Sequence, residues 1–193
     1  MHVDLVITYY DPSQKKVEML CNLMRSIGAY STRHSINVII VTNGPSYPES
    51  VNLGLRRSTG DYVIVLNDDV EIRDADWIDK MCQPGCITGW QLGVFHIKKV
   101  PVPDAACFAM SREVFQRVGY MDEKFKEGFN FEDTDYFFRA MQMGLPMVDA
   151  KVDLLHIGNQ TVKTYFSEAK AAGTHRNETL FRERWMPYLE SLT

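Results

Sequence analysis

Two neighbouring carboxylates at the end of an apolar segment, Asp68 and Asp69, are the first residues whose types suggest chemistry. They follow Asn67 and the apolar run 62–66. Adjacent carboxylates repel each other unless a cation or a hydrogen-bond donor compensates them. A divalent metal held between a protein carboxylate and a diphosphate is one such compensation. A solvated turn, in which Asn and Asp are common, is the alternative.

A second pair of acids, Glu132 and Asp133, stands at the start of a predicted helix over 132–143. Acids in a first turn complement the helix dipole, which is a purely structural reason for their presence. The functional interpretation is a general base that a rigid helix start presents. Three phenylalanines precede the pair, at Phe125, Phe129 and Phe131. Burial among them would raise the pKa of a carboxyl group toward the working pH.

A single histidine, His156, ends the mostly apolar run 152–155. A histidine at the end of a strand is either a hydrogen-bonded structural residue or a metal ligand. As a ligand, a neutral imidazole together with a carboxylate suits manganese better than calcium.

The elements that must position these residues begin with three apolar strands, predicted over 3–7, 36–41 and 62–66. Helices predicted over 17–27 and 51–58 separate them, with Gly28 and Gly60 as stops. This alternation is typical of a parallel α/β sheet, in which ligands bind beyond the carboxyl ends of the strands.

The second half of the chain is less regular. We expect strands over 92–97 and 105–110, one or two strands over 147–157, and helical structure over 163–192. A helix over 111–118 should be capped by Ser111, and 120–131 should be a loop. No repeat or linker is visible. The sequence therefore predicts one domain, 1–193, with a nucleotide-binding half, 1–100, and an acceptor-binding half, 101–193.

Composition narrows the function classes. The chain has 193 residues, 25 acidic and 21 basic, and a net charge of −4. This charge disfavours a protein that covers nucleic acid or binds an anionic membrane, although it leaves a local basic patch open. No apolar run reaches the roughly 18 residues that span a bilayer. The first seven residues lack a basic region, so we expect no signal peptide and a cytoplasmic protein. The four cysteines are expected to be free thiols, because only Cys82 and Cys86 are close in sequence.

Five segments are loose motifs individually but specific in their order and spacing. They are Val6-Ile7-Thr8-Tyr9-Tyr10-Asp11; Val41-Thr42-Asn43-Gly44-Pro45-Ser46; Asn52-Leu53-Gly54-Leu55 with 60–70; 110–123 with Phe131-Glu132-Asp133-Thr134-Asp135; and His156-Ile157-Gly158 with Asn177, Phe181 and Trp185. Together they resemble glycosyltransferase family 2, inverting nucleotide-sugar transferases with the Rossmann-like GT-A fold. The resemblance covers nearly the whole chain, and it implies a mostly parallel central sheet flanked by helices, with a mixed acceptor-side half.

The resemblance also implies roles for particular residues. Asp133 would be the general base and Glu132 would orient acceptor hydroxyls. Asp69 and His156 would hold Mn²⁺ or Mg²⁺. The nucleotide would contact residues that follow the first three strands and one in the second helix: Thr8, Tyr10, Asp11, Thr42, Asn52, Asn67 and Asp68.

Two positions depart from the family pattern. Thr42 stands where the family often has an Asp that accepts the uracil imide proton, so a UDP-sugar is expected while thymidine and guanosine donors stay open. Asn67 stands at the first position of the Asp-x-Asp metal motif. Asn67 cannot supply charge, so the resemblance implies that it hydrogen-bonds the ribose or another hydroxyl.

Two other functions compete with sugar transfer. A nucleotidyltransferase would need a glycine- and lysine-rich phosphate loop near the N-terminus, and residues 8–13 contain neither type. A catalytically inactive nucleotide-sugar or glycan-binding module of the same fold stays open. The acceptor, a hydroxyl compound of unknown class, would be bound by loops over 98–106 and 120–131.

Overall fold

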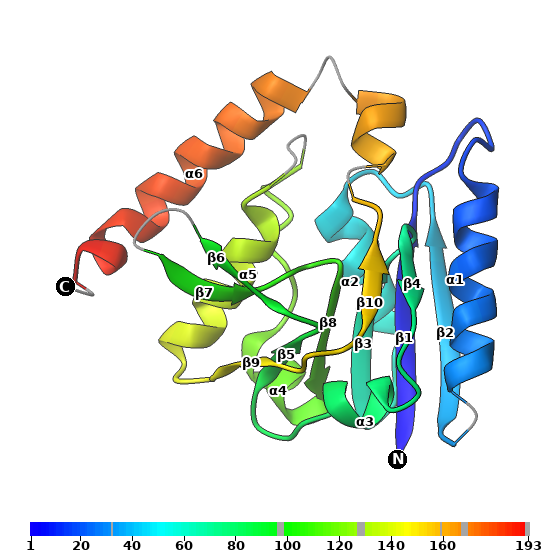
Figure 1. Cartoon of the computed structure of the whole chain (residues 1–193). Coiled ribbons are helices and arrows are strands. Elements are labelled where there is room, and N and C mark those ends of the chain that lie inside the picture. Colours follow the sequence, from blue (N-terminus) through cyan, green and yellow to red (C-terminus); the bar gives the residue numbers. More distant parts are fainter. Residues whose placement is uncertain (32, 96–98, 127–129, 159, 167–169, 192–193) are drawn as a thin grey trace.

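The computed structural model describes residues 1–31, 33–95, 99–126, 130–158, 160–166 and 170–191. Its centre is a six-stranded sheet in the order β2-β1-β3-β8-β5-β9, with helices on both faces (Figure 1). The expected α/β architecture is therefore confirmed. Ile97, Lys98 and Phe129, which belong to elements predicted above, lie outside the described residues.

The first part of the chain, 1–67, follows the predicted alternation of strand and helix. Its elements are β1 (His2–Tyr9), α1 (Val17–Tyr30), β2 (Ser35–Thr42), α2 (Tyr47–Arg57) and β3 (Tyr62–Asn67). Strand β1 pairs in parallel with both β2 and β3, so the ends of all three strands meet at one edge of the sheet. Two predicted helix bounds are wrong. Helix α1 continues through Gly28, and α2 begins earlier because the Ser46 side chain accepts a hydrogen bond from Glu49 N.

The next part of the chain contains several short elements. They are β4 (Val70–Ile72), α3 (Trp77–Met81), β5 (Ile87–Gly89), β6 (Leu92–Phe95), β7 (Val100–Pro103), β8 (Cys107–Ser111) and α4 (Arg112–Val118). Strand β8 lies antiparallel between β3 and β5, while β6 and β7 form a separate hairpin. The sheet is therefore mixed on the acceptor side, as expected. Helix α4 begins at the predicted cap, Ser111, whose side chain accepts from Val114 N.

The last third adds α5 (Glu132–Gln142), β9 (Met147–Asp149), β10 (Leu154–His156), the short π-helix η1 (Val162–Phe166) and α6 (Lys170–Ser191). Strand β10 pairs antiparallel with β4, which places His156 opposite Val70, the residue after Asp69. In Figure 1, η1 lies above the edge where β1 and β3 end, whereas α6 runs diagonally on the side of α5, β6 and β7. None of the described helices is long and apolar enough to cross a membrane.

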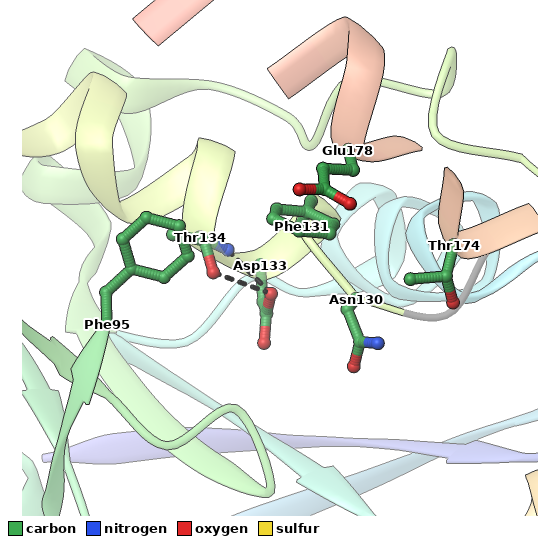
Figure 2. A pocket seen from close by; sticks show the side chains of 7 residues that line it. All are labelled: Phe95, Asn130, Phe131, Asp133, Thr134, Thr174 and Glu178. Carbon is green, nitrogen blue, oxygen red and sulfur yellow. Dashed lines mark hydrogen bonds between the residues drawn. The ribbon is translucent and has the colours of Figure 1, made fainter. Parts of the chain in front are cut away.

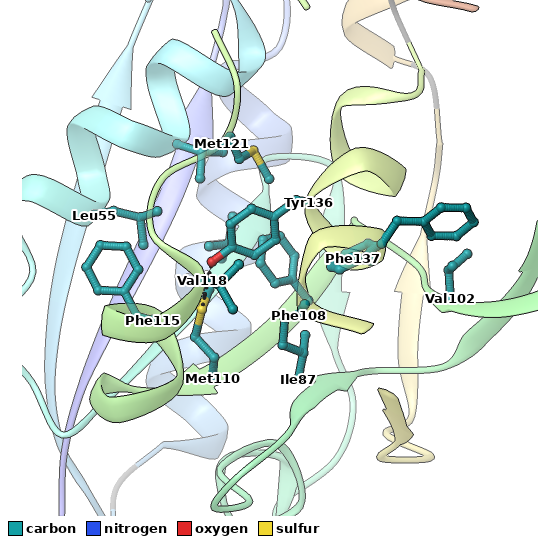
Figure 3. Close-up of a cluster of buried hydrophobic side chains, with 14 of the residues drawn as sticks. Leu55, Ile87, Val102, Phe108, Met110, Phe115, Val118, Met121, Tyr136 and Phe137 are labelled. Carbon is teal, nitrogen blue, oxygen red and sulfur yellow. Dashed lines mark hydrogen bonds between the residues drawn. The ribbon is translucent and has the colours of Figure 1, made fainter. Parts of the chain in front are cut away.

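Side chains alternate between two apolar cores, one on each face of the sheet. One core contains Val65 and Phe108 and is covered by α2, α4, α5 and α6; the other contains Leu5 and Ile64 and is covered by α1 and α3. Figure 3 shows part of the first core, where aromatic side chains of α4 and α5 meet β8. All four cysteine thiols are free, as expected.

A buried carboxylate fixes α6 against α5. Asp135 is fully buried and accepts hydrogen bonds from Arg139 Nε, Arg184 Nη1 (2.6 Å) and Trp185 Nε1 (2.9 Å). Arg184 also donates to Asp122. Because these bonds are charge-assisted and mostly buried, they hold the C-terminal helix in a defined position over the start of α5.

Candidate active site

The carboxyl edge of the sheet brings Asp69 and His156 together although 87 positions separate them. The Ile157 amide donates to the Asp69 carbonyl (3.0 Å), which continues the β4–β10 ladder. His156 Nε2 lies 3.3 Å from Asp69 Oδ1, yet it makes no well-aligned hydrogen bond with any described residue. Contact with Asp69 raises the pKa of His156. Burial raises the pKa of Asp69, but the neighbouring imidazole of His156 outweighs this effect, and the pKa of Asp69 is lowered.

This pair fits a divalent metal as two neighbouring ligands. Two ligand atoms at right angles around Mg²⁺ or Mn²⁺ stand about 3 Å apart, close to the separation of Nε2 and Oδ1. The described residues contain no group of three His, Cys, Asp or Glu side chains that could hold an ion. The remaining positions would therefore belong to water and to phosphate oxygens of a substrate, which is usual for metals that act on phosphates.

Asp68 faces away from that pair toward a buried lysine. The Lys16 ammonium donates to Asp68 Oδ2 and to Thr161 Oγ1 (2.6 Å), and both charged side chains are almost fully buried. Burial raises the pKa of Asp68 to about 6, although Lys16 opposes the shift. Asp68 is therefore paired inside the protein, and Lys16 is a residue that the sequence analysis missed.

Asp11 is the centre of a second network beside it. Its carboxylate accepts from the Lys15 and Lys16 amides (2.8 Å each) and from the hydroxyls of Tyr9 and Tyr165. Burial alone would raise the pKa of Asp11, but these hydrogen bonds lower it to about 2. Tyr165 belongs to η1, so this network joins the loop after β1 to the segment 160–166.

The other predicted nucleotide contacts divide into two groups. Thr8 and Thr42 stand at the ends of β1 and β2, and the Tyr10 ring lies edge-on to the ring of Tyr165 (5.6 Å). Asn67 ends β3, and its buried Oδ1 has no hydrogen-bond partner among the described residues. The structure does not bring Asn52 to this edge. Its buried amide in the middle of α2 bonds to the Met121 backbone and to Glu123.

The two acids at the start of α5 stand on an unusual backbone. Asn130 and Phe131 both have positive φ, 95° and 74°, a conformation that non-glycine residues adopt at an energetic cost. The fully buried Asn177 on α6 supports this turn, because its Nδ2 donates to the Asn130 carbonyl (3.2 Å). The turn directs Glu132 and Asp133 to the edge of the sheet.

Burial raises the pKa of both acids, which differ in their hydrogen bonds. Glu132 Oε2 has no hydrogen-bond partner among the described residues, and burial raises the pKa of Glu132 well above its ordinary value. Burial also raises the pKa of Asp133, against hydrogen bonds from the amide and hydroxyl of Thr134 to Asp133 Oδ1 (2.6 and 3.2 Å). Burial therefore favours the protonated form of both acids, and at Asp133 the hydrogen bonds from Thr134 oppose this effect.

A cavity of about 430 Å³ opens beside Asp133. Figure 2 shows Asp133 next to Thr134, Phe131 and Asn130, with Phe95 on one side of the view and Thr174 and Glu178 of α6 on the other. The lining residues are Phe95, Asn130, Phe131, Asp133, Thr134, Thr174 and Glu178. A cavity of this size suits a small organic ligand. Asn130 and Phe131 of the predicted loop 120–131 line this cavity, together with Thr174 and Glu178 of α6, a helix in which no individual site residue was predicted.

One carboxylate links the metal-ligand pair to this cavity. The charge of Asp104 raises the pKa of both His156 and Asp133, so both groups lie within electrostatic range of it. The described residues also include buried side-chain atoms without a hydrogen-bond partner: Asn67 Oδ1, Trp90 Nε1, Glu132 Oε2, His156 Nε2 and Asn177 Oδ1. Buried polar groups normally find partners, so a ligand would stabilise those of them that it reaches.

Comparisons with known proteins agree with this geometry. No protein-family model matches the sequence, and a search of curated proteins found no relative. Solved structures do match. The catalytic domain of Drosophila beta1,4galactosyltransferase 7, in complex with xylobiose, aligns with a TM-score of 0.64 and 15% identity over 83% of this chain and 72% of that chain.

Two further structures extend the likeness. GalNAc-T7 with UDP, GalNAc and Mn²⁺ aligns with a TM-score of 0.66 and 12% identity over 97% of this chain and 49% of that one. A mannosyltransferase from Pyrobaculum calidifontis, in complex with GDP-Man and Mn²⁺, aligns with a TM-score of 0.54 and 14% identity, over 76% and 54% of the two chains. The chain therefore has the GT-A type of fold found in glycosyltransferases, and the expected fold resemblance is confirmed.

Proposed function

We propose that this protein is an inverting glycosyltransferase that moves one sugar from a nucleoside diphosphate to an acceptor hydroxyl. The observation that carries the proposal is the position of Asp133, a half-buried carboxylate bordering a cavity and sharing the neighbourhood of Asp104 with His156. The alternative, an inactive sugar-nucleotide or glycan-binding module, would not need a proton acceptor at that position.

The donor would lie across the ends of β1, β2 and β3. Asn67 has an unpartnered amide oxygen there, which suits a ribose hydroxyl donor, and Thr8, Thr42 and Tyr10 surround the same edge. Because neighbouring structures were solved with UDP or with GDP-Man, we propose a UDP-sugar, with a GDP-sugar as the alternative. We leave Asn52 out of this set, since its amide is fully bonded elsewhere.

Asp69 and His156 would hold Mn²⁺ or Mg²⁺, which when bound stabilises negative charge on the departing diphosphate. Asp68 stays paired with Lys16 and so contributes no ligand. The buried Lys16–Asp68 pair fixes the strand end from which Asp69 projects.

Proton transfer would run through Asp133. The attacking hydroxyl lies in the cavity, and its proton passes to the Asp133 oxygen that Thr134 does not hold, while the bond to the anomeric carbon forms. Glu132 would orient the acceptor hydroxyls from the position beside Asp133, and burial, which raises its pKa, favours the protonated form that can donate a hydrogen bond. Attack from the cavity, opposite the departing diphosphate, inverts the anomeric carbon and passes through a transition state of oxocarbenium character.

The experiment is a screen of nucleotide sugars by thermal shift and by donor hydrolysis, with and without Mn²⁺. A donor should raise the melting temperature by mass action and release its nucleoside diphosphate slowly in water. Binding without any release, even with candidate acceptors present, would favour the inactive module. Neither binding nor release from any donor would overturn the proposal.

A further inference from the structure

The far wall of the cavity is built by the C-terminal helix. Thr174 and Glu178 are four residues apart on α6, so both side chains project from the same face of the helix. Figure 2 shows Glu178 across the cavity from the Phe95 ring. The helix itself is held in place through the contacts of Arg184 and Trp185 with Asp135.

The cavity is acidic. Asp133 and Glu178 contribute carboxylates to its lining, and none of the seven lining residues carries a positive charge. Arg182 donates to Glu178 Oε1 (2.8 Å) from the next turn of α6, which orients Glu178 and offsets part of its charge. The charge of Asp104 also reaches Asp133. An anionic group that entered this space would meet carboxylates and find no cation in the lining.

The rest of the lining suits a sugar ring. Its polar groups are the amide of Asn130 and the hydroxyls of Thr134 and Thr174, beside the two carboxylates. Phe95 and Phe131 are only 8% and 6% exposed, because their rings pack against each other and against Phe181. A pyranose has a rim of hydroxyls that can bond to the amide, hydroxyl and carboxylate groups, and its apolar C–H groups can contact the part of the rings that stays exposed.

We propose that the acceptor is an uncharged sugar residue of a glycan, that Glu178 on α6 binds its hydroxyls, and that acceptors carrying a phosphate or carboxylate beside the reacting hydroxyl are rejected. This inference rests on the proposed function, because it assumes that the cavity receives the acceptor. Glu178 takes no part in proton transfer and acts as a specificity residue.

The test uses the full chain with UDP and Mn²⁺ and matched pairs of probes that differ by one charge. p-Nitrophenyl β-glucoside is compared with p-nitrophenyl β-glucuronide, and N-acetylglucosamine with its 6-phosphate, by saturation-transfer NMR and calorimetry. The neutral member of each pair should bind at least about tenfold more tightly than the anionic member. Equal binding within the pairs, or binding of the anionic members alone, would overturn the inference.

Variants on α6 locate the selectivity. Glu178→Gln should weaken the binding of the neutral probes and lower the ratio of neutral to anionic affinity within each pair by roughly fivefold. Glu178→Lys should make the anionic probe of each pair the tighter ligand. Glu183→Gln, an exposed acid on the same helix that does not line the cavity, is the matched control and should leave the affinity ratio unchanged. If Glu183→Gln changed the affinity ratio as much as Glu178→Gln, the selectivity would arise from the overall charge of the protein, which would contradict the inference.

The outcome can be separated from that of the proposed function. Donor hydrolysis in water needs no acceptor, so its presence tests sugar-donor chemistry alone. If the donor is hydrolysed but the neutral and anionic probes bind equally, or the anionic probes bind more tightly, the acceptor assignment is wrong while the transferase proposal stands. Absent hydrolysis with selective binding of neutral sugars would overturn the transferase and leave a neutral-sugar site lined by Glu178. Melting curves of the variants guard against misfolding, and they should stay close to that of the wild type, since an exposed i,i+4 ion pair contributes little to stability.

Discussion

The two sides of the sheet's carboxyl edge satisfy their polar groups in different ways. On the side of β1, the Lys16 ammonium donates hydrogen bonds to Asp68 and to Thr161. The Asp11 carboxylate accepts from the Lys16 amide and from Tyr165, so this network includes the segment 160–166. At the start of α5, Glu132 has an unpartnered oxygen and Asp133 borders a cavity. A ligand that reaches the Asp11, Lys16 and Asp68 side chains must exchange existing hydrogen bonds, whereas a ligand at Glu132 supplies a missing one.

This difference separates stability from function within one site. Each buried polar atom without a partner lowers the stability of the fold by about 1–3 kcal/mol. The side at the start of α5, which is the proposed acceptor side, is therefore less stable without a ligand than with one. The donor side does the opposite, because its internal bonds stabilise the fold before any ligand arrives. Substitutions on the two sides should therefore change stability with opposite signs, and the predictions that follow test this contrast.

The largest expected effect is on the acceptor side. Asp133→Asn keeps the oxygen that accepts from Thr134 but removes the proton acceptor. Turnover should fall by roughly 10²–10⁴-fold while donor affinity stays close to that of the wild type. Initial rates and donor titrations measure the two. If the turnover of Asp133→Asn fell by less than tenfold while Glu132→Gln was inactive, the general base would be Glu132 instead.

The next effect is expected at Asp69, in the turn between β3 and β4. Asp69→Ala removes the carboxylate beside His156, and turnover and metal-dependent nucleotide binding should fall by roughly 10²-fold or more. Nucleotide titrations with Mn²⁺ and with chelator measure the loss. Glu190→Ala, an exposed acid far along α6, serves as the control. Full activity of Asp69→Ala in chelator would remove the metal from the proposal.

On the donor side, Asp11→Asn should destabilise the protein. A pKa of about 2 in the folded state, against 3.8 for an ordinary Asp, corresponds to about 2 kcal/mol of stability at pH 7. Because the folded pKa is lowered, this stability is present above pH 3.8 and is lost as the pH falls toward 2. The melting temperature should drop by roughly 4–8 °C at pH 7, and the difference should shrink in acid. If the difference in melting temperature stayed constant from pH 7 down to pH 2, the charge of Asp11 would not stabilise the network.

The smallest effect has the opposite sign. Burial raises the pKa of Glu132 above 4.5, so the folded protein loses stability as the pH rises through the raised value. Glu132→Gln does not titrate and should melt about 2–4 °C higher than the wild type at pH 8, with no difference below pH 4.5. Thermal melts from pH 4 to pH 8 measure this. A variant less stable than the wild type at pH 8 would mean that the internal environment of Glu132 favours its charged form.

The strands and the principal acids could be predicted because their signals are local. Strands β1, β2 and β3 are apolar runs long enough to recognise, and Asp69, Asp133 and His156 stand at the ends of such runs or helices. The three- to five-residue elements β4, α3, β5 and β7 were missed, since so few residues show no periodicity. The predicted stop at Gly28 was wrong because a single glycine costs a helix only about 1 kcal/mol.

Other site residues carry no local signal. Lys16 and Glu178 look like ordinary charged surface residues in the sequence, and Tyr165 looks like one aromatic residue among many. Their roles arise from contacts with distant segments, as when Lys16 meets Asp68 and Tyr165 meets Asp11. Asn52 shows the reverse case, a residue chosen by resemblance whose amide is used to attach α2 to the segment 121–123.

The strand order also has a consequence for synthesis of the chain on the ribosome. Strand β3 pairs with β1 on one side, but its other edge waits for β8, whose residues follow about 40 positions later. At 5–20 residues per second, that edge stays unpaired for roughly 2–8 s. An apolar strand with a free edge recruits other strands, so nascent chains on neighbouring ribosomes are at risk of aggregating in this interval. Slowing elongation between residues 67 and 107 should lower the yield of folded protein, and holdase chaperones should restore it.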